Sequence, residues 1–399
     1  MTPPTAPPRL RIAVLSRKFS TTGGGAERYS VALVEQLAAW HELHVFAQET
    51  EHGWPGVTYH RIGAAGLKPR WVNQLWFAAR TWQLTRRGFD VVHSHENTWH
   101  GDVQTVHVLP VRHNLFAGRA GWRQAARALK AATSPRLLAY LGLEHWRYAP
   151  RPGRQVVAAS ETLRDVLVAS YPACAPALAV VTPGIALPPA PATPARRAEA
   201  RAQLGLPRTG RCLLFVANDC RKKGLGTLLD ALARLPADVC LAVAGSTAQH
   251  PAFAAQARAL GLAARVFFLG PLKDMAPAYE AADCLAHPTL EDTFAMAVLE
   301  AMAHGVPVVV SAARYCGIAA LLQHGVNAAI VDDPRDAAQL HAALAGVLDD
   351  AARHAVLGAG ARHFARAHQW HEVARRQERV YFSVLAGKAA AAAGQKALA

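Results

Sequence analysis

Two acidic residues in the second half of the chain, Asp292 and Glu300, are separated by seven residues. If both lay on one helix, a rise of about 1.5 Å per residue would place them roughly 12 Å apart. A retaining glycosidase needs its carboxylates about 5 Å apart, so an acid/base pair acting on one bond is not indicated. The spacing instead suits the two ends of a long ligand, with the N–H groups around Phe294–Ala297 available to phosphate between them.

The alternative is an amphipathic helix with two unrelated acids. The segment Gly305-Val306-Pro307 returns the chain directly into a buried strand, and this favours a site over a surface helix.

Three consecutive cations, Arg221, Lys222 and Lys223, follow Asn218 and precede Gly224. Charge-assisted hydrogen bonds from such cations, together with the amino terminus of a helix expected over Leu225–Leu235, are suited to a diphosphate. The GxxxxGK[ST] spacing of a Walker A loop is absent. The competing interpretation is a basic turn in solvent.

Glycines Gly23, Gly24 and Gly25 follow the first expected strand and precede a helix. They permit close approach of the backbone to a ligand, although the pattern is not GxGxxG and does not indicate a dinucleotide. A flexible loop before a helix is the alternative interpretation.

A further polar cluster follows the strand expected to end at His93. It includes Asp102 and His107, and either side chain is a candidate to lie near a reacting acceptor hydroxyl, because ligands gather at the carboxyl ends of parallel strands. A single histidine beside a strand is more often a hydrogen-bonded structural residue. The inference of an acceptor site therefore rests on the cluster and not on either residue alone.

The composition indicates a folded protein with an anionic partner. The 399 residues are 52% hydrophobic and 18% charged, with a net charge of +15. Six cysteines without a CxxC pair indicate buried free thiols in a reducing compartment. Neither a signal peptide over Met1–Pro8 nor an apolar run of transmembrane length is indicated, so we expect a cytoplasmic protein.

Basic and aromatic residues alternate over Arg112–Arg154 and again over Lys68–Arg87, with Glu144 the one acid in the first stretch. Such helices suit an anionic membrane surface, and they would also bind a phosphorylated acceptor. A solvated basic face over buried aromatics is the alternative. No RRM, KH, helix-turn-helix or zinc-finger signature is present, so we expect no nucleic-acid partner.

Short apolar runs alternate with helical patterns throughout the chain, which predicts an α/β fold with parallel sheets. We expect an amino-terminal domain over residues 1–185, a proline-rich linker over 186–200 and a second domain over 201–368. A last helix over about 369–387 is expected to pack on the first domain, with a frayed tail over 388–399. The strands expected in the first half are Arg11–Ser16, Leu43–Ala47, Thr58–Ile62, Asp90–His93, Val103–Val108, Gln155–Ala159 and Ala179–Thr182.

The stretch from Asp292 through Glu300 to Val309 resembles the E-x7-E signature of the retaining family 4 glycosyltransferases of GT-B fold. Gly23–Arg28, Asn218–Gly224, Gly245 and Val266–Gly270 match further family motifs in order. Within this family, the chain is most similar to bacterial lipopolysaccharide core glucosyltransferases, and the resemblance covers nearly all of it.

The resemblance implies two Rossmann-like domains facing a cleft, and α-retaining transfer of glucose from UDP-glucose to an inner-core heptose at the inner membrane face. It implies a front-face mechanism without a protein nucleophile and without a metal or other cofactor. Arg221, Lys222 and Lys223 would bind the diphosphate, Glu300 the ribose and Asp292 the donor sugar. The remaining donor contacts it implies are Gly24, Gly25, Asn218, Gly245, Phe294, Ala295, Met296 and Ala297.

Two departures from the family pattern fall within the signature. Its first acid is Asp292 rather than glutamate, unless Glu291 serves in its place, and Ala295 replaces the usual glycine after Phe294. The alternatives are another family 4 transfer, from UDP-GlcNAc, UDP-galactose or GDP-mannose to a polysaccharide, and a GT-B sugar-nucleotide 2-epimerase.

Overall fold

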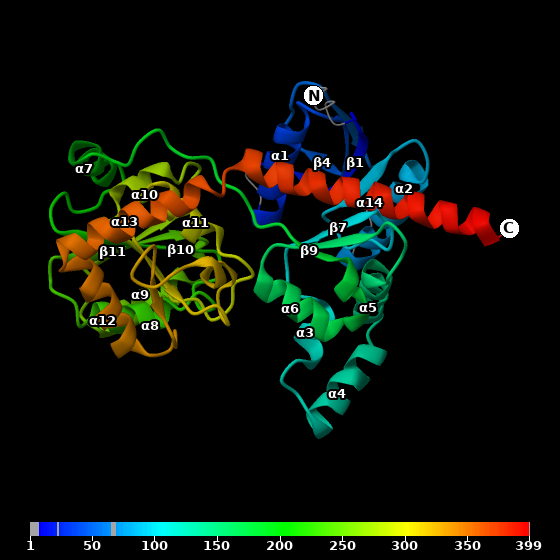
Figure 1. Ribbon diagram of the computed structural model, residues 1–399. Helices are drawn as coiled ribbons and strands as arrows, with labels where there is room; N and C mark the ends of the chain where they lie inside the picture. Colours follow the sequence, from blue (N-terminus) through cyan, green and yellow to red (C-terminus); the bar gives the residue numbers. More distant parts are fainter. Residues whose placement is uncertain (1–7, 22–23, 65–68, 399) are drawn as a thin grey trace. The chain divides into compact units, whose positions relative to one another are not determined.

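A computed structural model describes residues 8–21, 24–64 and 69–398 (Figure 1). The predictions made for Gly23, for Lys68 and for residues 1–7 lie outside this range. The chain forms two compact units, one of residues 1–184 with 370–399 and the other of residues 185–369. We call them the amino-terminal and carboxy-terminal units.

The carboxy-terminal unit contains a six-stranded parallel sheet in the order β12-β11-β10-β13-β14-β15. The strand order reverses between β10 and β13, and in open α/β sheets ligands bind beyond the carboxyl ends of the strands at this switch point. The strands are β10 (Arg211–Ala217), β11 (Val239–Gly245), β12 (Val266–Gly270), β13 (Cys284–His287), β14 (Val308–Ser311) and β15 (Ala329–Val331).

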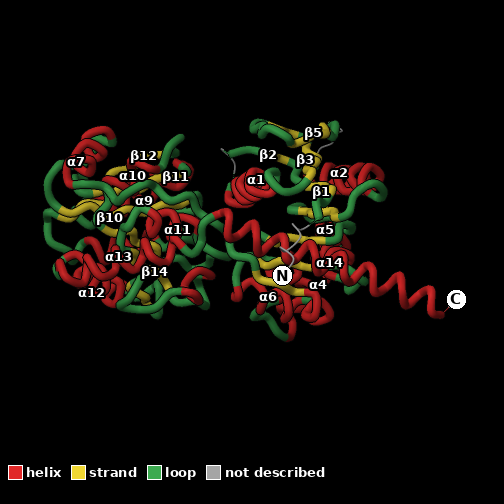
Figure 2. Tube along the Cα trace, turned by 45° about the horizontal axis from the view of Figure 1, so that its top comes forward, coloured by secondary structure: helices red, strands yellow, loops and turns green. Residues whose placement is uncertain are grey.

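Helices cover both faces of this sheet, as Figure 2 shows for red helices around yellow strands. Successive side chains of β10 point to opposite faces: Leu213 packs in a core with α8, α9 and α12, and Leu214 packs in a second core with α10, α11 and α13. Burial on both faces explains why the strands are almost entirely apolar. The helices are α7 (Pro194–Gln203), α8 (Leu225–Leu232), α9 (His250–Ala259), α10 (Ala276–Ala281), α11 (Met296–Ala303), α12 (Ala337–Leu348) and α13 (Ala351–Arg366).

The amino-terminal unit contains a seven-stranded parallel sheet in the order β5-β3-β1-β6-β7-β8-β9. Two short strands of the same unit, β2 (Lys18–Phe19) and β4 (Glu49–Thr50), form a separate two-stranded sheet. The sheet strands are β1 (Arg11–Leu15), β3 (Glu42–Ala47), β5 (Val57–Arg61), β6 (Val91–Ser94), β7 (Val103–Val106), β8 (Gln155–Ala158) and β9 (Leu178–Val180). Every strand expected in this half is present, with ends that differ by one or two residues.

Two helices far apart in the sequence, α1 and α14, contact each other in the amino-terminal unit. Tyr381 of α14 is fully buried in the same core as Ile12 and Val14 of β1. Phe77 of α2 packs with Ala13 and Leu15 in a separate core. The helices of this unit are α1 (Gly25–Leu37), α2 (Arg70–Thr85), α3 (Val111–Phe116), α4 (Gly121–Ala132), α5 (Pro135–Tyr148), α6 (Glu161–Ser170) and α14 (Trp370–Leu398), with a short 3₁₀ helix over Pro172–Ala177. The carboxy-terminal unit has short 3₁₀ helices over Thr247–Gln249 and Gly317–Leu321.

Two sequence predictions about irregular segments are wrong. The expected linker over 186–200 contains the start of α7, where Thr193 caps the helix and Pro194 occupies its first turn. The expected frayed tail over 388–399 continues α14 to Leu398, because alanine favours helix and Lys388 bonds to the carbonyl oxygen of Asp90. All six cysteines are buried and free, as predicted. Among the helices described here, none combines the length and apolar character that a membrane span requires.

Candidate functional site

Two loops meet at the switch point of the carboxy-terminal sheet. Strands β10 and β13 pair directly, with Leu213 opposite Cys284, so the loops after them leave the sheet side by side. The N–H of Leu290 donates to the carbonyl oxygen of Lys222 at 2.9 Å and joins the two loops. The topology therefore brings the predicted cations next to the predicted first acid.

Lys223 is the cation that reaches the acid. Its ammonium lies 2.5 Å from Oδ2 of Asp292 and also donates to the carbonyl oxygen of Glu291 at 3.1 Å. The two side chains are 20% and 16% exposed. An ion pair screened from water in this way is stronger than one on the surface.

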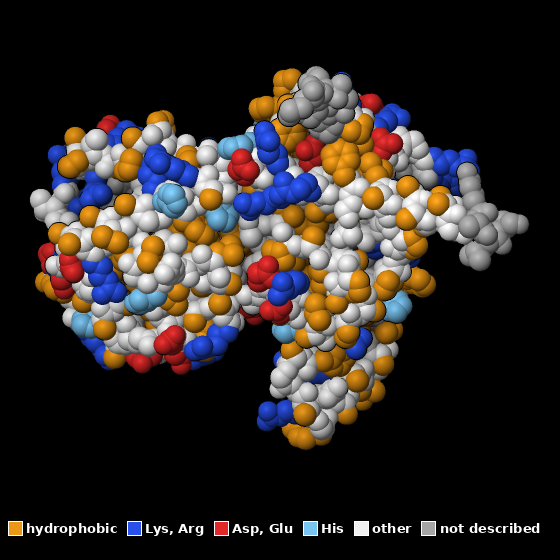
Figure 3. Space-filling model, in the orientation of Figure 1, with side chains coloured by type: hydrophobic (Ala, Val, Ile, Leu, Met, Phe, Trp, Pro, Cys, Tyr) orange, Lys and Arg blue, Asp and Glu red, His pale blue; other side chains and the backbone are white. Residues whose placement is uncertain are grey.

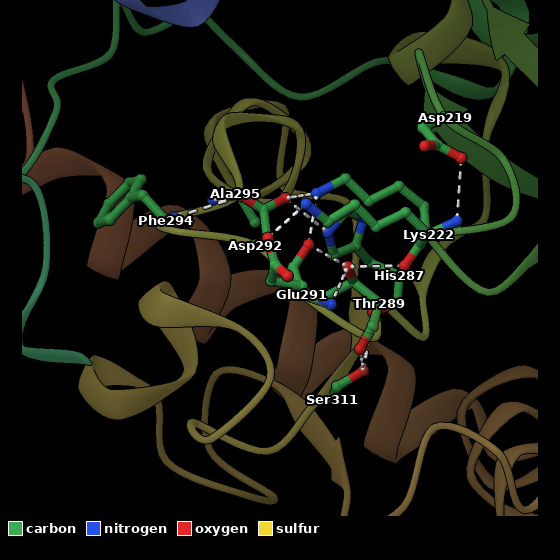
Figure 4. A network of polar contacts seen from close by, with 10 residues as sticks. Asp219, Lys222, His287, Thr289, Glu291, Asp292, Phe294, Ala295 and Ser311 are labelled. Atoms are coloured by element: carbon green, nitrogen blue, oxygen red, sulfur yellow. Dashed lines mark hydrogen bonds and ion pairs between the residues drawn. The ribbon is translucent and has the colours of Figure 1, made fainter. Parts of the chain in front are cut away.

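Both oxygens of Asp292 are engaged by the protein (Figure 4). His287 lies 3.2 Å from Oδ2, and Oδ1 accepts from the N–H of Ala295 at 2.9 Å. Burial alone would raise the pKa of Asp292, but the hydrogen bond with His287 and the charge of Lys223 outweigh it, so the pKa lies far below its usual value. The carboxylate is therefore ionised, and it orients Lys223 and the loop leading to α11.

Ala295 precedes α11 in a left-handed conformation, with φ at 76°. It is the one non-glycine residue with positive φ among the residues described. Its side chain is 3% exposed, so the strain is held by the packed core and by the bond to Asp292. The loop thus directs the amino terminus of α11, including Met296 and Ala297, towards the ion pair of Lys223.

Glu300 lies on the second turn of α11, whereas Asp292 lies in the preceding loop. The two acids therefore do not share a helix, and the spacing estimate based on one helix does not apply to them. The hydroxyl of Tyr279 on α10 donates to Oε2 of Glu300 at 2.5 Å. This bond fixes the orientation of the carboxylate of a half-buried residue.

Two glycines permit close backbone contacts around the site. A Cβ added to Gly224 would lie 2.0 Å from the carbonyl oxygen of Pro288, and one added to Gly245 would lie 1.9 Å from that of Ala217. Both residues have positive φ, at 81° and 126°. Only glycine fits both the space and the conformation.

The other predicted cations point elsewhere. Lys222 pairs with Glu291, and both side chains are about half exposed. Arg221 lines a cavity of about 320 Å³ together with Phe253 and Gln256 of α9. Asn218 is exposed at the end of β10. Of the predicted triad, Lys223 alone contacts Asp292.

The two residues predicted near the acceptor, Asp102 and His107, lie at opposite ends of β7. Five residue steps along an extended strand, at about 3.3 Å each, separate them by roughly 16 Å. Asp102 accepts from the N–H of Val92 at 2.8 Å and pairs with Lys388 at 2.8 Å. The structure therefore does not bring these two residues together, and it gives Asp102 a structural ion pair at the amino end of the strand.

His107 belongs to a cluster of rings at the carboxyl ends of β6 and β7. Its Nε2 lies 3.1 Å from Nδ1 of His95, and the ring of Tyr29 packs edge-on against it. Burial, with a smaller contribution from the Arg147 charge, lowers the pKa of His107 to about 3. A neutral imidazole of this kind hydrogen-bonds hydroxyls without adding charge.

Gly24 caps α1 and Gly25 begins it, both exposed. A Cβ added to Gly25 would meet nothing within 4 Å, which leaves the backbone open to a ligand.

Sequence reasoning missed two residues that position the site, His287 and Tyr279. His287 is buried at the end of β13, and a polar residue closing an apolar strand was a usable signal for it. Tyr279 is 21 residues from Glu300 in sequence, and no local pattern connects them.

Two Rossmann-like parallel sheets in one chain, with a lysine–aspartate pair and a helix terminus at one switch point, define a GT-B glycosyltransferase. The model for glycosyl transferases group 1 matches residues 196–364, and that for glycosyltransferase family 4 matches residues 23–187. A D-inositol 3-phosphate glycosyltransferase of Xylanimonas cellulosilytica is 33% identical over 67% of this chain and 70% of its own length. The chain therefore belongs to the family 4 glycosyltransferases.

Solved structures share the fold over nearly the whole chain. WaaG, a glycosyltransferase involved in lipopolysaccharide biosynthesis, superposes with a TM-score of 0.76 at 20% identity, covering 92% of this chain and 98% of WaaG. Anabaena Alr3699/HepE, solved in complex with UDP and glucose, superposes with a TM-score of 0.71 at 19% identity, covering 93% and 99%. These structural likenesses confirm the predicted fold class. The two family models and the relative from Xylanimonas cellulosilytica confirm the predicted enzyme class, a glycosyltransferase.

Proposed function

We propose that this glycosyltransferase transfers glucose from UDP-glucose, with retention, to a heptose of the lipopolysaccharide core or of a similar envelope glycolipid. The observation that carries the proposal is the placement of Lys223 and the start of α11 around Asp292. A diphosphate leaving group gains negative charge as the sugar departs, and an ammonium beside a helix amino terminus stabilises that charge.

The residues have separate roles in this proposal. Lys223 binds the diphosphate, with Lys222, Arg221 and Asn218 at its outer side. Glu300, oriented by Tyr279, accepts hydrogen bonds from the ribose hydroxyls. Asp292 orients Lys223 and α11, and the backbone from Phe294 to Ala297 meets the donor. No metal is required, because the lysine and the helix terminus supply the positive charge.

The amino-terminal unit supplies the acceptor residues in this proposal. His107, held neutral, hydrogen-bonds a sugar hydroxyl, and the backbone at Gly24 and Gly25 approaches the phosphates. We place Asp102 outside this group, because its ion pair with Lys388 lies at the other end of β7.

Peripheral association with the anionic inner face of the cytoplasmic membrane is part of the proposal. Helix α4 carries Arg123, Arg127 and Lys130 with Trp122, which is 76% exposed, and α4 contains no acid. Cosedimentation with phosphatidylglycerol vesicles, weakened by salt and absent with phosphatidylcholine, is the expected result. Cosedimentation that does not depend on salt, or no cosedimentation, would contradict the proposed membrane association.

A donor-by-acceptor screen tests the transfer. Purified protein is incubated with UDP-glucose, UDP-GlcNAc, UDP-galactose or GDP-mannose and with core oligosaccharide, in the presence and absence of EDTA. We expect transfer with UDP-glucose, unaffected by EDTA. If an epimerised donor forms without acceptor, the protein is a sugar-nucleotide 2-epimerase and the proposed transfer is wrong.

A second candidate acceptor is a phosphorylated cyclitol. The relative from Xylanimonas cellulosilytica is named for D-inositol 3-phosphate, so inositol 3-phosphate belongs in the same screen. Faster turnover with this acceptor than with core oligosaccharide would favour the second candidate.

A further inference from the structure

A hollow of about 520 Å³ lies between α2 and α5 on the amino-terminal unit. We call it the α2–α5 groove. Its volume falls in the range of small-molecule sites, about 300–1,000 Å³. Its walls are apolar except for one cation, and the residues that define it are Leu75, Trp99, Leu138, Leu143, Trp146 and Arg151.

One face of α5 forms the floor of the groove. Leu138, Gly142 and Trp146 are spaced by four residues and share one side of the helix. The missing side chain at Gly142 leaves the hollow between the two larger residues, and a Cβ added there would meet nothing within 4 Å. The groove is therefore built into the sequence of α5 rather than left by poor packing.

The groove exposes apolar surface to water. Leu138 is 50% exposed and Trp146 is 54% exposed. Covering such surface is favourable because it removes apolar atoms from water, and contiguous exposed apolar surface marks interaction sites. Most of the large hydrophobic side chains exposed in the described part of the chain lie between Trp76 and Trp146.

Cations accompany the exposed tryptophans. The guanidinium of Arg151 lies 5.7 Å from the ring centroid of Trp146. On α2, at the residue that follows it and on α4, three more arginines lie over tryptophans: Arg80 over Trp76 at 5.8 Å, Arg86 over Trp82 at 5.7 Å and Arg123 over Trp122 at 5.6 Å. Tryptophan favours the membrane–water interface, and arginine binds phosphate by paired hydrogen bonds.

Helices α2, α4 and α5 expose no acid beside the groove. Helices α2 and α4 contain no acid, and the single acid of α5, Glu144, is buried and accepts from the N–H of Val111 and the hydroxyl of Tyr171. Figure 3 shows orange and blue side chains, without red, over the projecting part formed by α4. An anionic amphiphile matches both the apolar surface and the positive charge. A neutral protein surface would match only the apolar part, and an acidic one only the charge.

We propose that the α2–α5 groove binds one acyl chain of an anionic phospholipid, with the lipid phosphate at Arg151. The proposal rests on the membrane association proposed above, and it adds a saturable site to a diffuse electrostatic attraction. A single inserted chain would fix the orientation of the amino-terminal unit at the membrane surface, which charge alone does not do.

The test uses a monomeric lipid, so that it does not depend on vesicles. Dodecyl phosphate below its micelle concentration is titrated into the full-length protein by calorimetry, with inorganic phosphate and dodecyl maltoside as comparison ligands. We expect saturable one-site binding of dodecyl phosphate, and at least tenfold weaker binding of each comparison ligand. Equal affinity for all three, or no binding, would overturn the proposal.

Gly142→Leu fills the groove from its floor, and Gly394→Leu adds the same side chain to an exposed position of α14 where a Cβ also meets nothing. We expect Gly142→Leu to weaken dodecyl phosphate at least tenfold, Arg151→Gln to weaken it several-fold, and Gly394→Leu to leave it unchanged. Unfolding temperatures of the variants confirm that each is folded.

Vesicle binding separates the two proposals. If the Gly142→Leu variant still sediments with phosphatidylglycerol vesicles but no longer binds dodecyl phosphate, the groove is a site distinct from the general membrane attraction. Wild-type protein that binds vesicles but not dodecyl phosphate keeps the membrane association and overturns the groove. Concentration-dependent dimerisation that Gly142→Leu abolishes would assign the groove to a second copy of the chain and also overturn the proposal.

Discussion

The ammonium of Lys223 lies 2.5 Å from Oδ2 of Asp292, while Oδ1 of the same carboxylate holds the N–H of Ala295 at the start of α11. One aspartate thus fixes both the cation and the helix terminus that would face a diphosphate. This double role explains why aspartate, rather than the longer glutamate, is accommodated at position 292, because its side chain reaches both partners from within the loop.

We expect Lys223→Ala to lower kcat/KM for UDP-glucose by about 10²–10³, the usual effect of removing one group that stabilises transition-state charge. Lys222→Ala, which removes a half-exposed cation paired with Glu291, is the matched control and should cost less than tenfold. Initial rates with both substrates varied measure the difference. Equal losses in the two variants would contradict the assignment of Lys223.

Asp292→Asn retains an acceptor for the Ala295 N–H and loses the charge. Because the pKa of Asp292 is far below its unfolded value near 3.9, the folded state is favoured by this carboxylate above pH 4 and loses that contribution as the pH falls further. The unfolding free energies of wild type and Asp292→Asn should therefore differ at pH 7, and the difference should shrink progressively as the pH falls below about 4. Chemical denaturation across this range checks the sign, and a difference that widens in acid would contradict it.

His93 gives the amino-terminal unit a separate sensitivity to acid. Its ring is fully buried between the hydroxyls of Tyr381 and Thr105, at 2.7 and 2.6 Å. Burial, with smaller contributions from His107 and Arg147, lowers its pKa to about 3. The unfolded chain takes up the proton first, so stability is full above pH 6.5 and falls below it, by about 2 kcal/mol at pH 5.

Denaturation at pH 7 and pH 5 measures this loss, and His93→Gln should show a smaller one. The exposed His371→Gln on α14 controls for the loss of a histidine. A wild-type protein equally stable at the two pH values would contradict the prediction.

Ala295 allows a test of backbone strain at the site. A β-branched residue at positive φ is strongly disfavoured, so Ala295→Val should destabilise the carboxy-terminal unit by about 3 kcal/mol or more. Ala295→Gly relieves strain but loses a buried methyl group and orders a more flexible residue, so its net effect should stay within about 1 kcal/mol. Thermal unfolding of both variants gives the comparison, and similar losses in both would show that the conformation is not the constraint.

Gly224 and Gly226 make a matched pair. Gly224→Ala sets a Cβ against the carbonyl oxygen of Pro288 at positive φ, whereas Gly226→Ala, in the first turn of α8, meets its nearest atom at an ordinary 3.6 Å. We expect a loss of about 3 kcal/mol for the first and no loss for the second. Unfolding free energies provide the measurement. Tolerance of Gly224→Ala would mean that the two loops are not held as close as described.

Substitutions of Asp102 and His107 should have different effects, because Asp102 has a structural role and His107 is the proposed acceptor residue. Asp102→Asn should lower stability by up to about 1 kcal/mol through its partly exposed pair with Lys388, and kcat/KM should stay within about threefold. His107→Ala should lower kcat/KM at least tenfold. Lys388→Ala, which removes the other partner of the same pair, should reproduce the Asp102→Asn phenotype. Loss of turnover in Asp102→Asn alone would return this residue to the acceptor site.

The predicted elements agree with the structure where the hydrophobic pattern is strong. Strands buried on both faces have nearly continuous apolar runs, so the strands expected over Arg11–Ser16 and Gln155–Ala159 correspond to β1 and β8. The segments predicted wrongly are irregular by composition. Proline and alanine over 186–200 and 388–399 suggested a linker and a frayed end, but a capped helix begins in the first and α14 occupies the second.

The sequence by itself determined the two α/β halves, the family signature and the residue types at the donor site, because these depend on local pattern and spacing. Tertiary structure decided which residues act together. It selected Lys223 from three adjacent cations, added His287 and Tyr279, and separated Asp102 from His107. The reason is that β10 pairs with β13 across about 70 residues of chain, and such a pairing depends on the packing of the whole sheet rather than on neighbours in sequence.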